Sequence, residues 1–239
     1  MFAIEYSTLF DFMLFGLEKL GIPIPLGGTS NHFRINILRK LYAWDPYNVT
    51  EDADLGLRMA QYGMTCGMVW SLTLEEAPIS TWAWIKQRSR WIKGHMQTYA
   101  VHMRKPRLLY KKLGPIGFFG TQLFLGAPTF IFLISPIMWM VWGGFAIGAL
   151  YIDTGTPEWF SLIILLSSVV LIAGVFLQIL CAAVAITRNK WKGMLVYSLI
   201  FPLYWTLHSV ASFRSLWQLL TRPHYWEKTN HGETTHKTI

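Results

Sequence analysis

Hydrophobic and polar positions divide this sequence into a polar first half and an apolar second half. Residues 1–112 mix apolar positions with charges in an ordinary globular balance, 14 Lys/Arg against 9 Asp/Glu. No charged residue lies between Lys112 and Asp153, and none lies between Glu158 and Arg188. Uncharged runs of this length are typical of membrane-spanning helices. The pattern predicts a polar domain followed by a membrane region.

The polar half has the spacing of short helices around one apolar strand. Apolar periodicity and capping residues predict helices over residues 1–20, 30–41, 51–62 and 81–102. Residues 64–74 are compact and apolar, and they favour a buried strand. Helices and a strand in this order are typical of part of an α/β domain, with too few strands for a complete one. We therefore expect residues 1–112 to be a partial α/β domain.

The second half of the sequence is predicted to form an α-helical transmembrane region over residues 113–220. A polar tail follows at residues 221–239. An interface segment and two spans are expected, over residues 114–125, 128–150 and 159–186. A third apolar run, residues 194–213, is interrupted by Pro202 and His208, so both a third span and a returning hairpin remain open. The loop at 187–192 is basic and the loop at 151–158 is acidic, which places the first inside the cell and the second outside.

Composition and charge support a membrane surface as a partner. Hydrophobic residues make up 53% of the chain, charged residues make up 14%, and the formal net charge is +8. Residues 86–112 carry nine Lys/Arg and no Asp/Glu directly before the first apolar run. A basic flank of this kind is expected on the cytoplasmic side. Nucleic acid is the other partner of basic stretches, but the interleaved tryptophans and the following span argue against it here.

An acidic cluster lies at the start of the predicted helix at 51–62. Thr50, Glu51, Asp52 and Asp54 stand at its start, where backbone N–H groups and the helix dipole favour an ionised carboxylate. Such a carboxylate beside a hydroxyl group can serve as a general base. The same residues are also ordinary helix-capping chemistry, and that interpretation stays open from these residues alone.

Metal ligation is not predicted for the acidic cluster. Asp52-Ala53-Asp54 has the form of a D-x-D pair, but two positions apart on a helix do not share a face. The two cysteines have no metal-ligand spacing. Cys66 lies in the polar half and Cys181 lies in the middle of the predicted membrane region, so we do not expect them to form a disulfide.

A basic aromatic cluster lies on the predicted helix at 81–102. Gln87, Arg90 and Trp91 occupy positions i, i+3 and i+4, so they share one face that offers an amide, a guanidinium and a flat ring. A guanidinium suits a phosphate, and an indole ring suits the apolar face of a sugar. Arg88 and Lys93 are expected to project elsewhere, toward solvent or lipid headgroups. A surface helix anchored by Trp at the membrane is the alternative.

Together these motifs resemble those of the membrane-embedded, GT-A-fold family 2 glycosyltransferases, which include cellulose, chitin and hyaluronan synthases. The resemblance covers nearly the whole chain. It rests on Thr50-Glu51-Asp52, on Gln87-Arg88-Ser89-Arg90-Trp91, on Gly27-Gly28-Thr29-Ser30-Asn31 with Arg34 and Trp44-Asp45, and on a tail from Arg222-Pro223 to Trp226-Glu227-Lys228-Thr229.

The resemblance implies a reaction and a role for each motif. Asp52, with Glu51 and Thr50, is expected to be the general base that deprotonates an acceptor hydroxyl. The expected substrate-binding residues are Gln87, Arg90, Trp91, Gly28 and Thr29. The reaction is inverting transfer of a sugar from a nucleotide-diphosphate donor to a growing glycan, at a bacterial inner (plasma) membrane, with a multi-pass chain and the catalytic part in the cytoplasm.

One part of the family pattern is missing. The strands that bind the nucleotide, and the D-x-D pair that holds Mg²⁺ or Mn²⁺ in this family, would lie before Met1. The resemblance thus predicts the C-terminal half of an enzyme, inactive by itself. The alternative from a different class is a non-catalytic membrane protein, a transporter or scaffold subunit. Ionisable residues within the spans would then mark a substrate path, and only His208 and Arg214 come near that.

Overall fold

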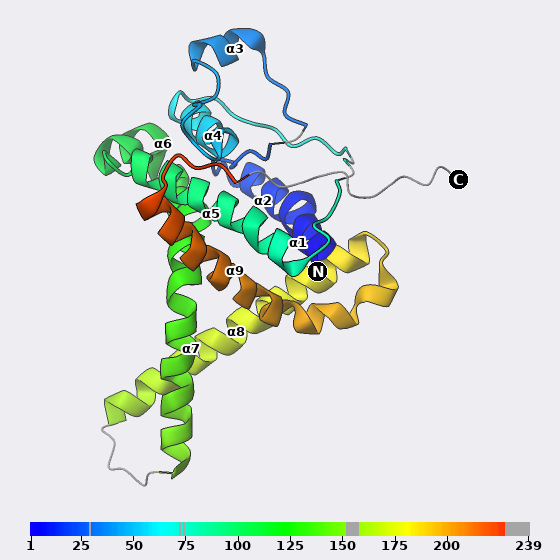
Figure 1. Cartoon of the computed structure of the whole chain (residues 1–239), viewed down its shortest axis with the longest axis vertical. Helices are drawn as coiled ribbons and strands as arrows, with labels where there is room; N and C mark the ends of the chain where they lie inside the picture. Colours follow the sequence, from blue (N-terminus) through cyan, green and yellow to red (C-terminus); the bar gives the residue numbers. More distant parts are fainter. Residues whose placement is uncertain (29, 72, 74, 152–157, 228–239) are drawn as a thin grey trace. The chain divides into compact units, whose positions relative to one another are not determined.

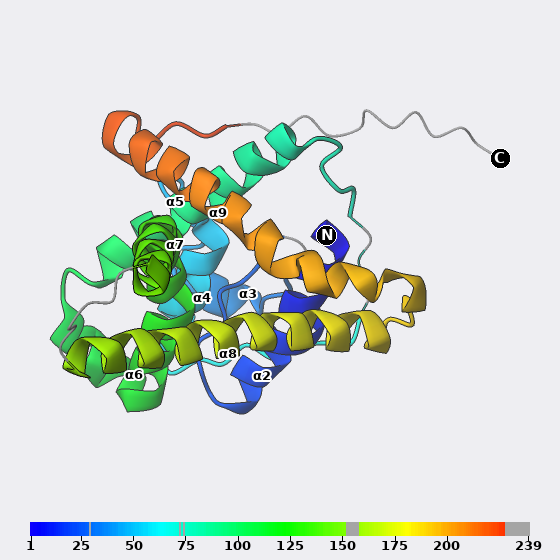
Figure 2. The ribbon, with the colours of Figure 1, turned by 90° about the horizontal axis from the view of Figure 1, so that it is seen from below.

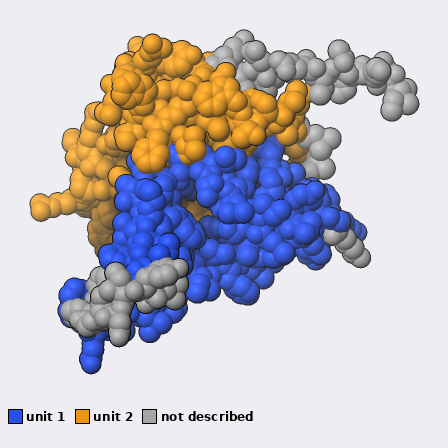
Figure 3. All heavy atoms as spheres, turned by 60° about the horizontal axis from the view of Figure 1, so that its bottom comes forward, with its two compact units in different colours: residues 1–12, 131–209 blue, residues 13–130, 210–239 orange. Residues whose placement is uncertain are grey.

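The computed structural model describes residues 1–28, 30–71, 73, 75–151 and 158–227 (Figure 1). Two compact units are present, and each is described by itself (Figure 3). Unit 1 consists of Met1–Phe12 and Ile131–Ser209, and unit 2 consists of Met13–Phe130 and Val210–Ile239.

The helices follow the apolar periodicity closely. In the polar half they are α1 (Phe2–Ser7), the π-helix η1 (Thr8–Met13), α2 (Leu14–Lys19), α3 (Ile35–Lys40), α4 (Glu51–Gln61) and α5 (Thr81–His102). The Oγ of Ser80 accepts the N–H of Ala83 (3.1 Å) and caps α5. Gly63, at φ 71°, ends α4 in the left-handed region that glycine tolerates. The predicted helices at 1–20, 51–62 and 81–102 are confirmed, as are the stop at Gly63 and the cap at Ser80, whereas the helix predicted over 30–41 begins only at Ile35.

The predicted strand is not formed. The described part of the chain contains no strand or sheet, so the prediction of a partial α/β, GT-A-like domain is wrong. Residues 64–71 run as irregular chain, and the N–H of Met68 donates to Oε2 of Glu18 (3.0 Å). A strand needs a neighbouring strand to satisfy its backbone groups, and helices offer no such edge. An apolar, β-rich sequence therefore stays irregular here.

The apolar half is entirely helical where it is described. Its elements are α6 (Pro106–Thr121), the π-helix η2 (Gln122–Gly126), α7 (Ala127–Tyr151), α8 (Glu158–Arg188), the 3₁₀ turn η3 (Lys192–Met194) and α9 (Val196–Thr221). Gly114, at φ 67°, breaks the helical geometry within α6 just before Pro115. From Val196 onward the run at 194–213 lies in one continuous helix, α9, so the hairpin alternative is excluded. Most of the predicted loop 151–158 lies outside the described residues.

Two helical stretches are long and apolar enough to cross a membrane, one within Pro106–Phe145 and one within Ser161–Arg188. α9 does not reach the same hydropathy. α8 is apolar on all sides, yet Val170 and Phe176 are 72% and 66% exposed. Helices that are apolar all round are either buried or surrounded by lipid. The exposed apolar surface of α8 supports membrane association.

Unit 1 has a small helical core with a polar flank. Ile4, Ala182, Ile186 and Phe201 are buried together where α1, α8 and α9 meet. α7 meets α8 where Nε1 of Trp142 donates to Oγ of Ser168 (2.9 Å), and both appear as long helices in Figure 1. Within α1 and α9, Glu5 accepts a hydrogen bond from the Tyr204 hydroxyl (2.6 Å) and lies 3.1 Å from Nε2 of His208. His208 is thus a paired histidine between helices.

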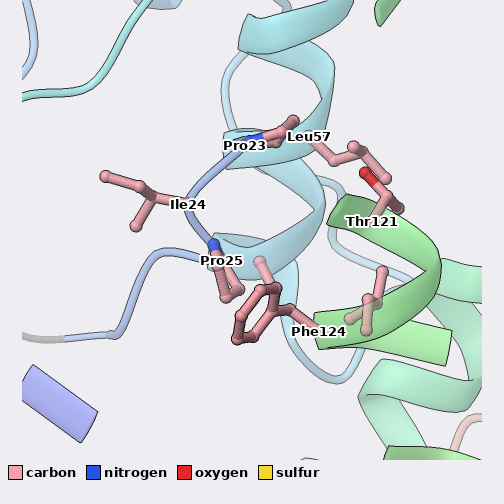
Figure 4. A pocket seen from close by; sticks show the side chains of 8 residues that line it. Pro23, Ile24, Pro25, Leu57, Thr121 and Phe124 are labelled. Atoms are coloured by element: carbon pink, nitrogen blue, oxygen red, sulfur yellow. The ribbon is translucent and has the colours of Figure 1, made fainter. Parts of the chain in front are cut away.

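Unit 2 packs helices closely through small residues. α5 and the last part of α9 lie side by side, and Oγ of Ser215 donates to the carbonyl of Ser89 (2.7 Å; Figures 1 and 2). A side chain added at Gly56 would meet the carbonyl oxygen of Ile24, so α4 touches the 22–26 segment directly. A cavity of about 20 Å³ remains beside this contact (Figure 4), lined by Pro23, Ile24, Pro25, Ala53, Leu57, Thr121, Phe124 and Leu125. The packing fixes the N-terminus of α4, where the acidic cluster lies.

Candidate active site

The N-terminus of α4 is held against α5 rather than capped in the usual way. The Thr50 hydroxyl is buried, makes no capping hydrogen bond, and has no hydrogen-bond partner among the described residues. A Cβ at Gly94 of α5 would lie 2.4 Å from Cγ2 of Thr50. The N–H of Thr50 donates to Asn48 (3.1 Å), whose amide donates to Thr98 of α5 (2.8 Å). Capping alone therefore does not explain the acidic cluster.

Asp52 is a half-buried carboxylate with one local hydrogen bond. Its Oδ1 accepts the N–H of Ala53 (2.8 Å), and its Oδ2 lies 3.4 Å from where a Cβ on Gly28 would stand. Burial, with a smaller contribution from Glu51, raises the pKa of Asp52 from 3.8 to about 6. The sequence argument expected the helix terminus to favour the ionised form, but removal from water outweighs the Ala53 hydrogen bond. A carboxylate with a pKa of about 6 is mostly ionised at neutral pH and accepts a proton readily.

Asp54 is bound in a structural network and is not available to a ligand. Its Oδ2 accepts from Nε of Arg58 (2.6 Å), and its Oδ1 lies 2.7 Å from Nε2 of His102 on α5. Burial alone would raise the pKa of Asp54, but the bonds from His102 and Arg58 lower it overall. Arg58 also donates to the carbonyls of Leu41 and Ala43. Asp54 therefore fastens α4 to α5 and to the end of α3.

The described residues do not fit the divalent cation that the resemblance implies. They contain no group of three or more His, Cys, Asp or Glu side chains placed to hold a metal ion. Both oxygens of Asp54 are bonded to protein groups, so Asp52 and Asp54 do not converge on one ion. Of the two predicted substrate-binding residues before α4, Gly28 lies beside Asp52, and Thr29 lies outside the described residues.

The predicted shared face of α5 is split among different neighbours. Gln87 is buried, and its Oε1 has no hydrogen-bond partner in the part of the chain that is described. Trp91 lies under the guanidinium of Arg88, 4.3 Å from the ring centroid. Arg90 donates to the carbonyl of Glu227 (3.1 Å) and lies 5.1 Å from the ring of Trp226. Gln87 lies two turns before Gly94 on one side of the helix, whereas Arg90 faces the C-terminal segment.

Arg88 and Lys93 are buried, so the prediction that they face solvent or lipid is wrong. Arg88 is only 3% exposed and packs over two indole rings, those of Trp84 and Trp91. Burial, with the charge of Arg88, lowers the pKa of the neighbouring His95 to about 4. Lys93 is fully buried, and burial lowers its pKa while Glu227 opposes this.

Lys93 holds a segment that sequence reasoning did not connect to α5. We call residues 222–227 the strap. The ammonium of Lys93 donates to the carbonyls of Arg222 (2.7 Å) and Tyr225 (2.8 Å), and Gln97 donates to the carbonyl of Pro223 (2.8 Å). The strap and α5 are more than a hundred residues apart in sequence. The resemblance marked the tail as a motif, but no sequence signal pairs it with α5.

The carboxylate of Glu227 fixes the end of the strap. It accepts two hydrogen bonds from Nη2 of Arg214 on α9 (2.8 and 3.0 Å) and one from Gln218 (3.2 Å). Burial would raise the pKa of Glu227, but these bonds and the charge of Arg214 lower it. Arg214 also lies 5.2 Å from the ring of Trp82 at the start of α5. Arg214, which the transporter alternative would have placed on a substrate path within the membrane, is therefore a partner of the strap.

A pocket of about 550 Å³ opens between the loop before α4 and the strap. Its wall includes Glu51, one residue before the candidate base Asp52, and it is lined by Trp44, Asp45, Pro46, Tyr47, Asn48, Val49, Glu51, His224 and Trp226. A pocket this size accommodates a small-molecule or sugar ligand. Glu51 of the acidic cluster and two residues of the strap thus line one pocket in unit 2, and no residue of α5 is among its described lining residues.

Comparison with protein families identifies the family of the chain. The model for glycosyl transferase family group 2 matches residues 3–226, which include the acidic cluster, α5 and residues 222–226 of the strap. Comparison with curated proteins and with solved structures found no match. Because the match covers most of the chain, the chain belongs to glycosyl transferase family group 2.

Proposed function

We propose that this family 2 glycosyltransferase uses Asp52 as the general base of an inverting sugar transfer. The observation that carries the proposal is the Asp52 carboxylate itself, which is half-buried at the N-terminus of α4, has a pKa of about 6 and follows Glu51, a residue that lines a pocket. A base is most effective when its pKa lies near the working pH. Asp54, with both oxygens bonded, has no such freedom.

The reaction is written as one displacement. Asp52 takes the proton of an acceptor hydroxyl, and that oxygen forms a bond to the anomeric carbon of the donor sugar. The bond from that carbon to the diphosphate breaks, and the nucleoside diphosphate leaves with the electron pair. Glu51 lies in the pocket wall and Gly28 lies beside the base, so both border the acceptor oxygen in this scheme.

Arg90 and Gln87 have separate roles in this proposal, Arg90 toward the leaving diphosphate and Gln87 toward a hydrogen-bond donor of the substrate. The guanidinium of Arg90 carries a positive charge at the strap, where a leaving diphosphate would be neutralised. Gln87 offers a buried carbonyl oxygen without a hydrogen-bond partner among the described residues, a group that gains from a ligand donor. Trp91 is held under Arg88 and supplies a ring next to both. No step is assigned to a metal ion.

The membrane placement belongs to the same proposal. Five exposed basic residues precede the first apolar stretch, Arg104, Lys105, Arg107, Lys111 and Lys112. Two more exposed cations lie at the other end of the second apolar stretch, Arg188 as the last residue of α8 and Lys190 just after it. Positive flanks of spans remain in the cytoplasm, so the site faces the cytoplasm of a multi-pass bacterial inner-membrane protein. Two helices long and apolar enough to cross a membrane support this part of the proposal.

The test replaces Asp52 with Asn at the chromosomal locus and measures transfer in isolated membranes from radiolabelled UDP-glucose and UDP-N-acetylglucosamine. General-base removal is expected to lower the rate by about 10²–10⁴-fold. Glu75→Gln, which removes an exposed carboxylate of unit 2, is expected to leave the rate unchanged. Full activity of Asp52→Asn at normal protein levels would exclude Asp52 as the base.

A transporter or scaffold role predicts that Asp52→Asn changes nothing while membrane insertion is intact, so the same variant separates the two classes of function.

A further inference from the structure

The turn that ends α3, residues 41–43, has a strained backbone. Tyr42 and Ala43 have φ angles of 59° and 56°, both in the left-handed region. The N–H of Tyr42 donates to the carbonyl of Arg39 (3.1 Å), and the N–H of Ala43 donates to the carbonyl of Leu38 (2.9 Å). These two bonds form a Schellman motif, in which the left-handed residue after the helix is usually glycine. Tyr42 therefore occupies a position that favours glycine.

Other helices of the chain show what is unusual about this turn. α2 and α4 end with the same pair of hydrogen bonds, and glycine takes the left-handed position in both, Gly21 at φ 66° and Gly63 at φ 71°. α8 ends on Lys190 (φ 61°), where one residue rather than two is left-handed. The left-handed conformation brings a Cβ too close to the following carbonyl oxygen, and glycine avoids this clash. Two such residues in succession persist only where their surroundings hold them.

Arg58 of α4 binds both ends of this turn. Its Nη1 donates to the carbonyl of Leu41, and its Nη2 donates to the carbonyl of Ala43 (2.8 Å). Its Nε donates to Asp54 (2.6 Å), which also lies 2.7 Å from Nε2 of His102 on α5. A guanidinium is planar and presents its N–H groups in a rigid fork. The two carbonyls of the turn are therefore held at a fixed separation by a side chain that is itself fixed.

The turn leads into the loop before α4, residues 44–50. The loop starts at the turn that Arg58 binds and ends at Thr50, whose N–H donates to Asn48 (3.1 Å). The amide of Asn48 donates in turn to α5 (2.8 Å). Most of the described residues that line the 550 Å³ pocket belong to this loop. The loop is thus fixed at both ends, and it ends two residues before Asp52.

We propose that Arg58 is a positioning residue, which holds the turn in its strained conformation and so keeps the loop in place beside Asp52. The loop starts on a side chain of α4 and ends at the first turn of the same helix, so its position is set relative to the base. Arg58 lies about 9 Å along the helix axis from Asp52 and acts through the loop, not on the reacting atoms. Only the effect on transfer rests on the proposed function, and the hold on the turn does not.

The test separates the fork of Arg58 from its charge. Arg58→Lys keeps a cation for Asp54, but an ammonium lacks the planar fork that spans two carbonyls. In nanodiscs, the Tm of this variant is expected to stay near that of the wild type, while amide hydrogen exchange over residues 41–48 rises about tenfold or more. Transfer from radiolabelled UDP-sugars in isolated membranes is expected to fall about tenfold or more, because a displaced loop misplaces the substrate.

Relief of the strain is the main control. Glycine tolerates the left-handed region, so Tyr42→Gly with Ala43→Gly should keep the turn in place without the fork. Tyr42 is 90% exposed, and loss of its ring removes little contact. Added to Arg58→Lys, the two glycines are expected to restore transfer and exchange to within about threefold of the wild type. Glu75→Gly, at an exposed residue outside the turn, is expected to restore neither.

A change in the opposite direction leaves Arg58 and Asp54 intact. Ala43→Val places a β-branched side chain in the left-handed region, which such residues tolerate least. Transfer should then fall about threefold or more although the fork is present. This variant tests the proposal even where Arg58→Lys does not fold.

Four outcomes overturn the proposal. These are unchanged exchange over residues 41–48 in Arg58→Lys, a loss of transfer that the two glycines do not restore, equal restoration by Glu75→Gly, and full transfer by Ala43→Val. The measurements also separate this proposal from the proposed function. Full transfer by Asp52→Asn refutes only the base, because exchange at the turn still reports on Arg58. Loss of transfer by Asp52→Asn with unchanged exchange in Arg58→Lys refutes only the positioning role.

Discussion

Replacing Asp52 with Asn should stabilise the protein at neutral pH while it removes the proposed base. Burial is the main reason that the pKa of Asp52 rises from 3.8 to about 6, so the ionised form is costly in the folded state. The rise corresponds to at most about 3 kcal/mol. Because Asp52 is only half-buried, water screens part of this energy, and a gain of about 1–3 kcal/mol is expected. Asn keeps an oxygen that can accept the N–H of Ala53.

The sign of the pH dependence follows from linkage. A carboxyl with a raised pKa binds its proton more tightly in the folded state, so its contribution is fully present below about pH 4. That contribution is lost as the pH rises from about 4 through about 6. Asn does not titrate, and the advantage of Asp52→Asn over the wild type should grow across this range and then stay constant.

Thermal unfolding in nanodiscs, followed by tryptophan fluorescence at pH 4.5, 6.0 and 7.5, measures the effect. For a chain of this length, the expected Tm of Asp52→Asn exceeds that of the wild type by about 2–10 °C at pH 7.5. The difference should shrink at pH 4.5. Glu75→Gln, at an exposed position, should show no such trend. A variant less stable than the wild type at pH 7.5, or an offset that is the same at all three pH values, would refute the reasoning.

Three further predictions concern the contacts that build the site. Gly94→Ala should cost about 1–3 kcal/mol of stability in denaturant unfolding, since the new Cβ would lie 2.7 Å from the backbone N of Thr50, whereas Gly16→Ala meets no atom within 4 Å and should cost nothing. Lys93→Met should leave the carbonyls of Arg222 and Tyr225 without their donor, and amide hydrogen exchange across the strap should then rise about tenfold or more. An unchanged rate of amide exchange would contradict the role of Lys93. Asp54→Asn should lose about 3 kcal/mol at pH 7, and the deficit should shrink below pH 4, because bonding lowers the pKa of Asp54 despite burial; a deficit independent of pH would count against this.

Local signals in the sequence predict the elements of the site but not their contacts. The acidic first turn and Gly63 define α4, and Ser80 marks the start of α5, because capping and glycine stops act over a few residues. Long-range pairs have no such signal. Lys93 and the strap, or Arg214 and Glu227, are known as partners only once the helices are placed.

The strand predicted at residues 64–74 does not form, and the reason is that local composition does not determine strand pairing. Residues 64–74 have the apolar, β-rich composition of a strand, and composition is all that a local analysis can weigh. Strand formation depends on a neighbour to pair with, and the described residues around this segment are helical. The helical predictions succeed because a helix satisfies its own backbone, whereas a strand does not.

The basic run at 86–112 shows how position alters the meaning of charge. Arg88 and Lys93, near its start, are buried, and Arg90 binds the strap, so these cations organise the site and leave no charge for lipid headgroups. The cations at 104–112 are exposed and precede the apolar helix. A count of nine positive charges therefore overstates the electrostatic attraction to an anionic leaflet, at about 1 kcal/mol per exposed Lys or Arg. The proposed cytoplasmic orientation depends on the five later cations, whereas Arg90 and Lys93 hold the strap, which supplies Trp226 to the pocket beside Glu51.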